Sequence, residues 1–167
     1  MKLELKSIKI NERMSEETTC FTADLFVNGK KLCYVENIGK GGCTDYNLHN
    51  LKNAKLLKEV EEYCKSLPDF IYHKTLIKQN LEFVIDDLLE KYLKAKNLKK
   101  MEKRMEKSLL YGTPNSYRVI TWKGTTIAEM LTNPHGILPL KSKIKELLNN
   151  GETILNTNLP QNFLEKI

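Results

Sequence analysis

Apolar and polar residues alternate at the start of the chain, the pattern of a β-strand that buries one face. Leu3 and Leu5 stand among charged neighbours, and the apolar set then changes phase to Ile8 and Ile10. Because side chains point alternately to the two faces of a strand, this one-residue slip predicts either a β-bulge near Lys6–Ser7 or a change in which face is buried. We expect this strand to open an antiparallel β-meander.

Two further strands are predicted at 19–27 and 30–37, and they complete a meander over about residues 2–38. Asn28-Gly29 joins them, and Asn-Gly favours a type I′ turn because both central residues need positive φ. The turn predicts that Leu25 faces Leu32, which gives the hairpin one apolar and one mostly polar face. The apolar face comprises Phe21, Ala23, Leu25, Val27, Leu32 and Tyr34, and the polar face Thr22, Asp24, Lys31 and Cys33.

From residue 48 onward the apolar residues recur every three or four positions, the period of an amphipathic helix. Helices are predicted at 48–66, 78–95 and 97–110. The last two come from one long pattern whose halves lie on different sides of the helix axis, so a straight helix cannot bury both against one core. We therefore expect a kink or break within 94–97, with Asn97 as the cap of the second piece. The two halves are Leu81, Ile85, Leu88 and Tyr92, and then Leu98, Met101, Met105 and Leu109.

The rest of the chain mixes strand and helix patterns. Alternation from Tyr117 predicts a strand that ends at a turn over Lys123-Gly124. Residues 125–131 fit either a strand or a short helix, and we favour a strand. A loop at 133–136 and a short amphipathic helix at 140–148 complete the pattern.

Strands, then helices, then strands again predict the α+β class rather than a parallel α/β fold. The length of 167 residues suits one domain, residues 1–167, with sub-parts 1–111 and 112–167. Apolar runs stay well short of the roughly 18 residues that span a bilayer, and the first residues lack the continuous apolar stretch of a signal peptide. We therefore expect a cytoplasmic protein with no membrane contact.

Cysteine and histidine spacing gives no metal-binding pattern. The sequence has four cysteines without a C-x-x-C pair, and His49, His73 and His135 lie far apart. Structural zinc sites use closely spaced ligand pairs, so no metal and no cofactor are expected. The cysteines are Cys20, Cys33, Cys43 and Cys64.

The net charge of +6 is concentrated in one segment. Residues 91–107 hold eight basic and two acidic side chains, so this segment alone accounts for +6. Most of the basic residues share one side of the predicted helix, opposite Met101 and Met105. This basic face is either a solvated outer surface or a contact for nucleic-acid phosphates, whose binding weakens as salt rises. It comprises Lys96, Lys99, Lys100, Lys103, Arg104 and Lys107.

The glycine-rich segment ENIGKGGCTDYN, residues 36–47, follows the predicted hairpin. It fails the spacing of a Walker A loop and of a dinucleotide-binding turn. Two interpretations stay open: a tight corner that needs positive φ, or a nest of backbone N–H groups that binds an anion next to a helix N-terminus. The candidate ligand-binding residues are Gly39, Lys40, Gly41, Gly42, Thr44, Asp45 and Tyr46.

A catalytic site has weaker support. Asp24, Lys40 and Asp45 would have to converge for a phosphodiester-cleaving site, and no D-x-D or E-x-K signature accompanies them. Adjacent carboxylates such as Asp86 and Asp87 point about 100° apart on a helix and do not converge on one metal. No residue is therefore assigned a catalytic role.

The segment 17–47 resembles a family of small uncharacterised proteins found in bacteria, prophages and phages. That family carries a pattern like E-T-x-x-F-x-A-x-L-x-V-x-G-K, followed by N-x-G-x-G-G. This chain departs from it at Lys40, where histidine or arginine is frequent, and at Asn47, where histidine is frequent. The matching residues are Glu17, Thr18, Phe21, Ala23, Leu25, Val27, Gly29, Lys30, Asn37, Gly39, Gly41 and Gly42.

The resemblance implies an intracellular, phage-borne protein that acts by binding. Our leading hypothesis is a non-enzymatic phage accessory or counter-defence protein that binds an anionic ligand, either a nucleotide signal or a nucleic-acid backbone. The alternative is a protein-interaction module that inhibits a host factor through the hairpin edge or the surface of Met101 and Met105. A phosphodiester-acting enzyme ranks third. The oligomeric state stays open, and a homo-oligomer is compatible with the sequence.

Overall fold

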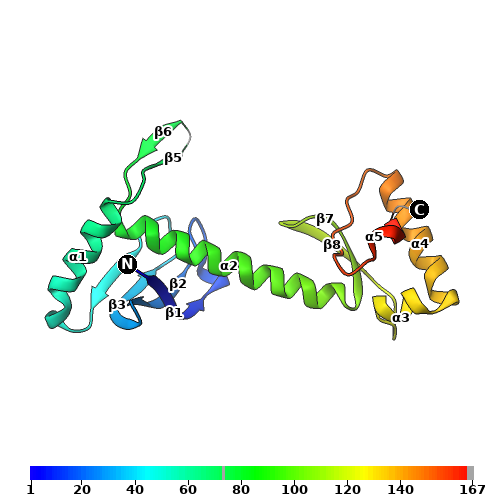
Figure 1. The fold of residues 1–167 in the computed structure, drawn as a ribbon, viewed down its shortest axis with the longest axis horizontal. Helices are drawn as coiled ribbons and strands as arrows, with labels where there is room; N and C mark the ends of the chain where they lie inside the picture. The colour runs from blue at the N-terminus through cyan, green and yellow to red at the C-terminus, as the bar shows by residue number, and fades with distance from the viewer. Residues whose placement is uncertain (73, 165–167) are drawn as a thin grey trace. The chain divides into compact units, whose positions relative to one another are not determined.

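A computed structural model describes residues 1–72 and 74–164 and has the predicted α+β fold (Figure 1). Backbone contacts separate the chain into unit 1, Met1–Leu93, and unit 2, Lys94–Ile167. His73, noted above for its spacing, lies outside the described residues. Among the described helices, none combines the length and the apolar character needed to cross a membrane.

Unit 1 is built on a four-stranded antiparallel sheet in the order β1-β2-β3-β4. The predicted meander is confirmed, and so is the slip in its first strand. Ser7 has a φ of +53°, and the pairing of β1 with β2 shifts between Lys6 and Lys9. The strands are β1 Leu3–Ile10, β2 Phe21–Val27, β3 Lys30–Asn37 and β4 Asp45–Leu48, with a 3₁₀ turn, η1 Glu12–Met14, between β1 and β2.

The β2–β3 hairpin turns at Asn28-Gly29 with positive φ at both residues, as predicted. Its register then departs from the prediction. The pairing shifts between Leu25 and Phe26, so Leu25 faces Cys33 instead of Leu32. One extra residue in a strand reverses the facing of everything beyond it, and both Leu32 and Cys33 are consequently buried. The residues whose predicted face is reversed are Cys33 and Tyr34.

The chain reaches its first α-helix later than predicted. Residues 45–48 form the edge strand β4, although the predicted helix began at residue 48. A 3₁₀ turn, η2 Leu51–Asn53, precedes the helix α1, Ala54–Lys65, which buries Val60 and Cys64 in the core of unit 1. A hairpin not predicted from the sequence follows, β5 Phe70–Tyr72 and β6 Thr75–Ile77.

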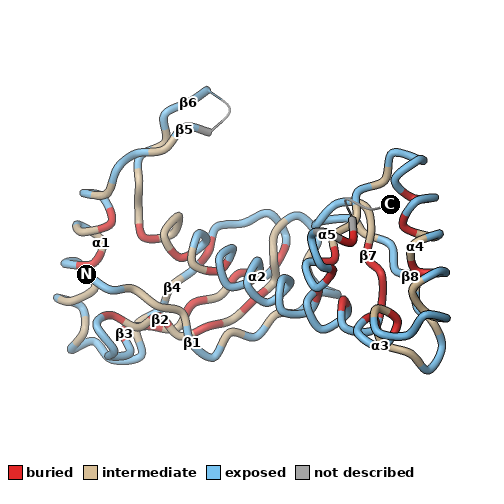
Figure 2. Tube along the Cα trace, turned by 45° about the vertical axis from the view of Figure 1, so that its right-hand side comes forward, coloured by how far each residue is buried: buried red, intermediate tan, exposed pale blue. Residues whose placement is uncertain are grey.

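Helix α2, Leu81–Met105, is continuous, so the break predicted within 94–97 and the cap at Asn97 are wrong. Part of each predicted apolar stripe is buried, the first in the core of unit 1 and the second in a separate core of unit 2, whereas Tyr92 and Leu98 are exposed. The turns between them, residues 94–100, are exposed on every side (Figure 2). The buried residues are Leu81, Ile85 and Leu89 in unit 1, and Met101 and Met105 in unit 2.

The boundary between the two units falls inside α2 and not between residues 111 and 112, the predicted limit of the sub-parts. The helix predicted at 97–110 ends at Met105, and β7, Ser108–Thr113, follows directly. Leu109 matched the helical period only by coincidence, because it is a buried residue of β7. β7 pairs with the predicted strand β8, Ser116–Thr121, across a turn at Pro114.

Residues 125–131, for which we favoured a strand, lead into the helix α3, Ile127–Thr132. A capping box starts it: the Thr126 hydroxyl accepts from the Glu129 N–H, and the Glu129 carboxylate accepts from the Thr126 N–H. The predicted loop at 133–136 is the first turn of α4, Pro134–Asn149, whose N-terminus is capped by Asn133. Proline at the first helical position costs no hydrogen bond, so the segment joins the helix.

The last described segment closes the core of unit 2. Ile154 forms an isolated β-bridge to Tyr111 of β7, and α5, Gln161–Leu164, follows. The side chain of Asn156 is buried and bonds to β7 and to the end of α2. Its Oδ1 accepts from the Leu110 N–H at 2.6 Å, and its Nδ2 donates to the Ser108 carbonyl at 3.0 Å.

Candidate functional site

The glycine-rich segment forms a closed corner against the connection between β1 and β2. Gly39 has a φ of +86°, and an added Cβ there would lie 2.2 Å from the Met14 carbonyl oxygen. The Gly39 carbonyl accepts three backbone N–H groups, from Glu16 at 2.9 Å, Glu17 at 3.1 Å and Thr18 at 3.4 Å. Glycine is therefore required for both its backbone angle and the close approach of the two loops.

Asn37, which the sequence analysis named for the family resemblance but not as a candidate site residue, organises this corner. Its Oδ1 accepts from the Gly39 N–H at 2.9 Å and from the Thr18 hydroxyl at 2.8 Å. Its Nδ2 donates to the Gly42 carbonyl at 3.0 Å. The Gly41 N–H in turn donates to the Thr18 hydroxyl, so two N–H groups of the proposed anion nest are used within the protein. An asparagine at the end of a strand, just before glycines, was the available sequence signal.

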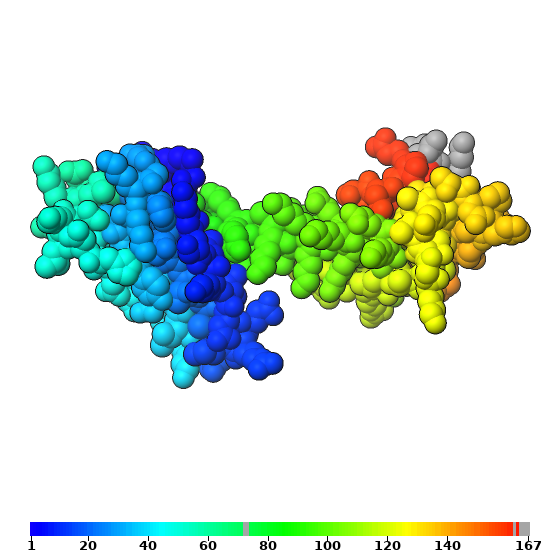
Figure 3. Space-filling model, turned by 90° about the horizontal axis from the view of Figure 1, so that it is seen from below, coloured from blue at the N-terminus to red at the C-terminus, as the bar shows by residue number. Residues whose placement is uncertain are grey.

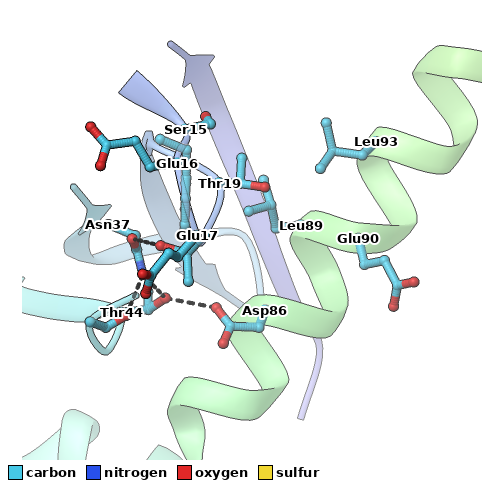
Figure 4. Close-up of a pocket in the computed structure, with 13 residues that line it drawn as sticks. Ser15, Glu16, Glu17, Thr19, Asn37, Thr44, Asp86, Leu89, Glu90 and Leu93 are labelled. Atoms are coloured by element: carbon cyan, nitrogen blue, oxygen red, sulfur yellow. Dashed lines mark hydrogen bonds between the residues drawn. The ribbon is translucent and has the colours of Figure 1, made fainter. Parts of the chain in front are cut away.

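Thr44, Asp45 and Tyr46 do not cap a helix, because they enter the edge strand β4. The buried Thr44 instead connects the corner to α2: its N–H donates to Glu82 at 3.0 Å and its hydroxyl to Asp86 at 2.7 Å (Figure 4). Successive residues of a strand point to opposite faces, and Asp45 is accordingly exposed whereas Tyr46 is half-buried. The three side chains therefore do not face one common ligand.

Tyr46 has its hydroxyl fixed by an acidic partner. It donates to Glu61 of α1 at 3.1 Å. Burial and this hydrogen bond raise the pKa of Tyr46 to about 12, so the phenol keeps its proton across the physiological range.

A pocket of about 530 Å³ opens between the glycine corner and α2, and Gly42 and Thr44 line it (Figure 4). All its charged lining residues are acidic. Desolvation raises the pKa of the Asp86 carboxyl group, the hydrogen bond from Thr44 lowers it, and the nearby Glu82 raises it again. A ring of carboxylates repels phosphate, so the pocket does not suit the anionic ligand expected there. The acidic residues are Glu16, Glu17, Asp86 and Glu90.

The residues proposed for phosphodiester cleavage do not converge. Asp24 lies on β2 and forms an ion pair with Lys31 at 2.8 Å, whereas Asp45 lies on β4, with β3 between them. Two strand spacings separate them by about 10 Å before their offset along the strands is added. Lys40 is exposed on the loop. Among the described residues, no group of three or more His, Cys, Asp or Glu is arranged to hold a metal ion.

The residues of the basic face are exposed, as predicted, and all but the last of them belong to α2. The five helical residues are exposed, and Figure 3 shows the side chains of α2 (green) at the surface. Lys107 is exposed in the turn that follows the helix. At the end of α2, Arg104 Nη1 donates to the Tyr117 hydroxyl at 2.9 Å, and the guanidinium lies 5.7 Å from the ring centroid.

Charge is distributed unequally between the two units. Unit 2 contains 13 Lys and Arg against six Asp and Glu, a net charge of +7. Unit 1 contains 14 Lys and Arg against 15 Asp and Glu, a net charge of −1. Attraction of a polyanion therefore concentrates on unit 2.

The two surfaces predicted to contact a protein partner, the hairpin edge and the side chains of Met101 and Met105, are covered by other parts of the protein. Met101 and Met105 are only 6% and 5% exposed and pack against Leu110. The β2–β3 hairpin lies in the middle of its sheet, where β1 and β4 pair with its outer edges.

Comparisons with protein-family models, with curated proteins and with solved structures found no match to this chain.

Proposed function

We propose that this protein is a non-enzymatic nucleic-acid-binding protein that contacts the phosphate backbone through the basic face. The observation that carries the proposal is the row of five exposed cations on one side of α2, within a unit of charge +7. Lysine and arginine that neutralise phosphates supply most of the sequence-independent affinity for nucleic acids.

The length of the basic face favours a backbone over a single nucleotide. Lys96 and Arg104 are eight residues apart, which corresponds to about 12 Å along a helix axis. A duplex carries about seven phosphate charges over that distance. The acidic pocket of unit 1, in contrast, offers no basic lining residue to a nucleotide signal.

The test is a salt titration of binding to a labelled oligonucleotide, measured by fluorescence anisotropy. The variant Lys99→Glu/Lys103→Glu reverses two exposed charges. It should bind more weakly, and the negative slope of log K against log salt should become shallower by about 2. Lys55→Glu/Lys58→Glu on α1 makes the same charge change at exposed positions of unit 1 and should leave the slope unchanged.

An equal effect of the two variants would mean that net charge, and not the basic face, governs binding. Absence of any binding by the wild-type protein at low salt would refute the proposal outright.

A further inference from the structure

A small cavity of about 200 Å³ opens beside the basic face, between α2 and the turn of the β7–β8 hairpin. We call it the hairpin notch. All its residues belong to unit 2, and Lys100 belongs to both the notch and the basic face. A strand held along the basic face therefore passes directly beside this recess. The lining residues are Asn97, Lys100, Met101, Pro114, Asn115 and Tyr117.

We propose that the hairpin notch receives one unstacked nucleobase, so that the protein binds single-stranded nucleic acid in preference to duplex. This inference rests on the proposed function, because backbone contacts along the basic face bring the strand to the notch.

The apolar part of the notch suits the flat face of a base. Met101 is 6% exposed and Tyr117 is half-buried, so both are held by packing. The hydrogen bond and the cation–π contact from Arg104 fix the Tyr117 ring further. A pre-positioned aromatic ring next to cations is the usual means by which proteins hold unpaired bases.

The polar part of the notch offers groups that match the edge of a base. Asn97 and Asn115 are exposed, and neither side chain forms a hydrogen bond with any other described residue. Each carboxamide supplies donors and an acceptor, the combination that pairs with the edge of adenine. None of the six lining residues is acidic, in contrast to the four carboxylates around the pocket of unit 1.

The size of the notch sets the preference for single strands. Its volume lies below the roughly 300–1,000 Å³ of pockets that enclose whole small-molecule ligands, so it fits one planar group. A base within a duplex is stacked and paired, and its removal costs a few kcal/mol. A base of a single strand enters without most of that cost.

The experiment compares wild type and Asn97→Ala/Asn115→Ala by fluorescence anisotropy at fixed salt. The probes are a short adenine-rich DNA strand, the same sequence as RNA, and the matching DNA duplex. The double variant should bind the single strands roughly tenfold more weakly and the duplex within about twofold of wild type, with an unchanged salt slope. Asn149→Ala/Asn150→Ala removes two exposed carboxamides elsewhere in unit 2 and should bind as wild type does.

Each remaining outcome overturns the inference. If wild type binds single strand and duplex equally and the double variant changes neither, the notch takes no base, while the proposed function stands. If the variant weakens all probes alike, the notch contributes no preference for single strands. If wild type binds no probe at low salt, the proposed function and this inference fail together. The DNA and RNA probes show which sugar the site accepts.

Discussion

The substitution Asn156→Ala should destabilise unit 2 more than the same substitution of any exposed asparagine. The side chain is 6% exposed and makes four hydrogen bonds, to Met105, Ser108, Leu110 and Asn158. In Asn156→Ala the N–H of Leu110, a fully buried residue, loses its acceptor.

The magnitude follows from these contacts. A buried donor left without a partner costs about 1–3 kcal/mol, and the missing side chain adds a small cavity. The Met105 carbonyl also accepts a hydrogen bond from Asn158 Nδ2 at 2.8 Å, and this bond remains in the variant. The hydrogen bond that Met105 loses is therefore partly compensated. We expect a decrease of about 3 kcal/mol in the free energy of unfolding, which corresponds to roughly 12–24 °C in the melting temperature of a domain the size of unit 2.

The assay is urea unfolding followed by the fluorescence of Trp122, the single tryptophan of the chain and a residue of unit 2. The matched control is Asn115→Ala, which removes an exposed carboxamide without an internal hydrogen bond and should change stability by less than about 0.5 kcal/mol. Hydrogen exchange at the Leu110 amide gives a local readout of the lost bond. An Asn156→Ala protein within about 0.5 kcal/mol of wild type would refute the reasoning.

Two further predictions concern unit 1. Gly39→Ala should destabilise it by about 2–4 kcal/mol, since it combines a positive φ with a Cβ placed 2.2 Å from a backbone oxygen, whereas Gly29→Ala, with φ +82° and open space, should cost about 1 kcal/mol. Hydrogen exchange of β2 and β3 measures both, and equal costs would contradict the role of the close approach. The pKa of Tyr46 is raised to about 12 in the folded state, so as the pH rises the phenol ionises first in the unfolded state. The stability that the Tyr46 hydroxyl contributes is therefore complete below about pH 10 and is lost as the pH rises towards 12. Tyr46→Phe should therefore show a shallower loss of stability over that window in circular dichroism titrations, and a loss as steep as in wild type would contradict the assignment.

The sequence predicted the elements whose patterns are local. Alternation and the Asn-Gly turn identified β1, β2 and β3, and the three- and four-residue period identified α1 and α2. The capping box of Thr126 and Glu129, and the Asn133-Pro134 start of α4, were also local signals, and they would have identified both helices. The strand that we favoured at 125–131 conflicts with the capping box at Thr126, which indicates the start of a helix.

Other features depend on contacts between distant segments and leave no local pattern. β4 has only four residues and is defined by its pairing with β3. The continuity of α2 could not be predicted without knowledge that its buried residues belong to two different cores. In the candidate site, helical periodicity identified the basic face, but the acidic surroundings of the glycine corner come from distant residues such as Asp86, which lies 42 positions after Thr44. The hairpin notch likewise requires α2 and the β7–β8 turn to meet.

The bond between Asn156 and the end of α2 also has a consequence for synthesis on the ribosome. Met105 precedes Asn156 by 51 residues, which a ribosome translates in about 3–10 s at roughly 5–20 residues per second. During that interval Met101 and Met105 lack the segment that completes their core, and they stay open to contact with other nascent chains. Lys100, Lys103 and Arg104 flank them in the sequence, and charged residues beside exposed apolar ones oppose aggregation. We therefore expect the basic side chains of the basic face to limit aggregation of unit 2 during its synthesis.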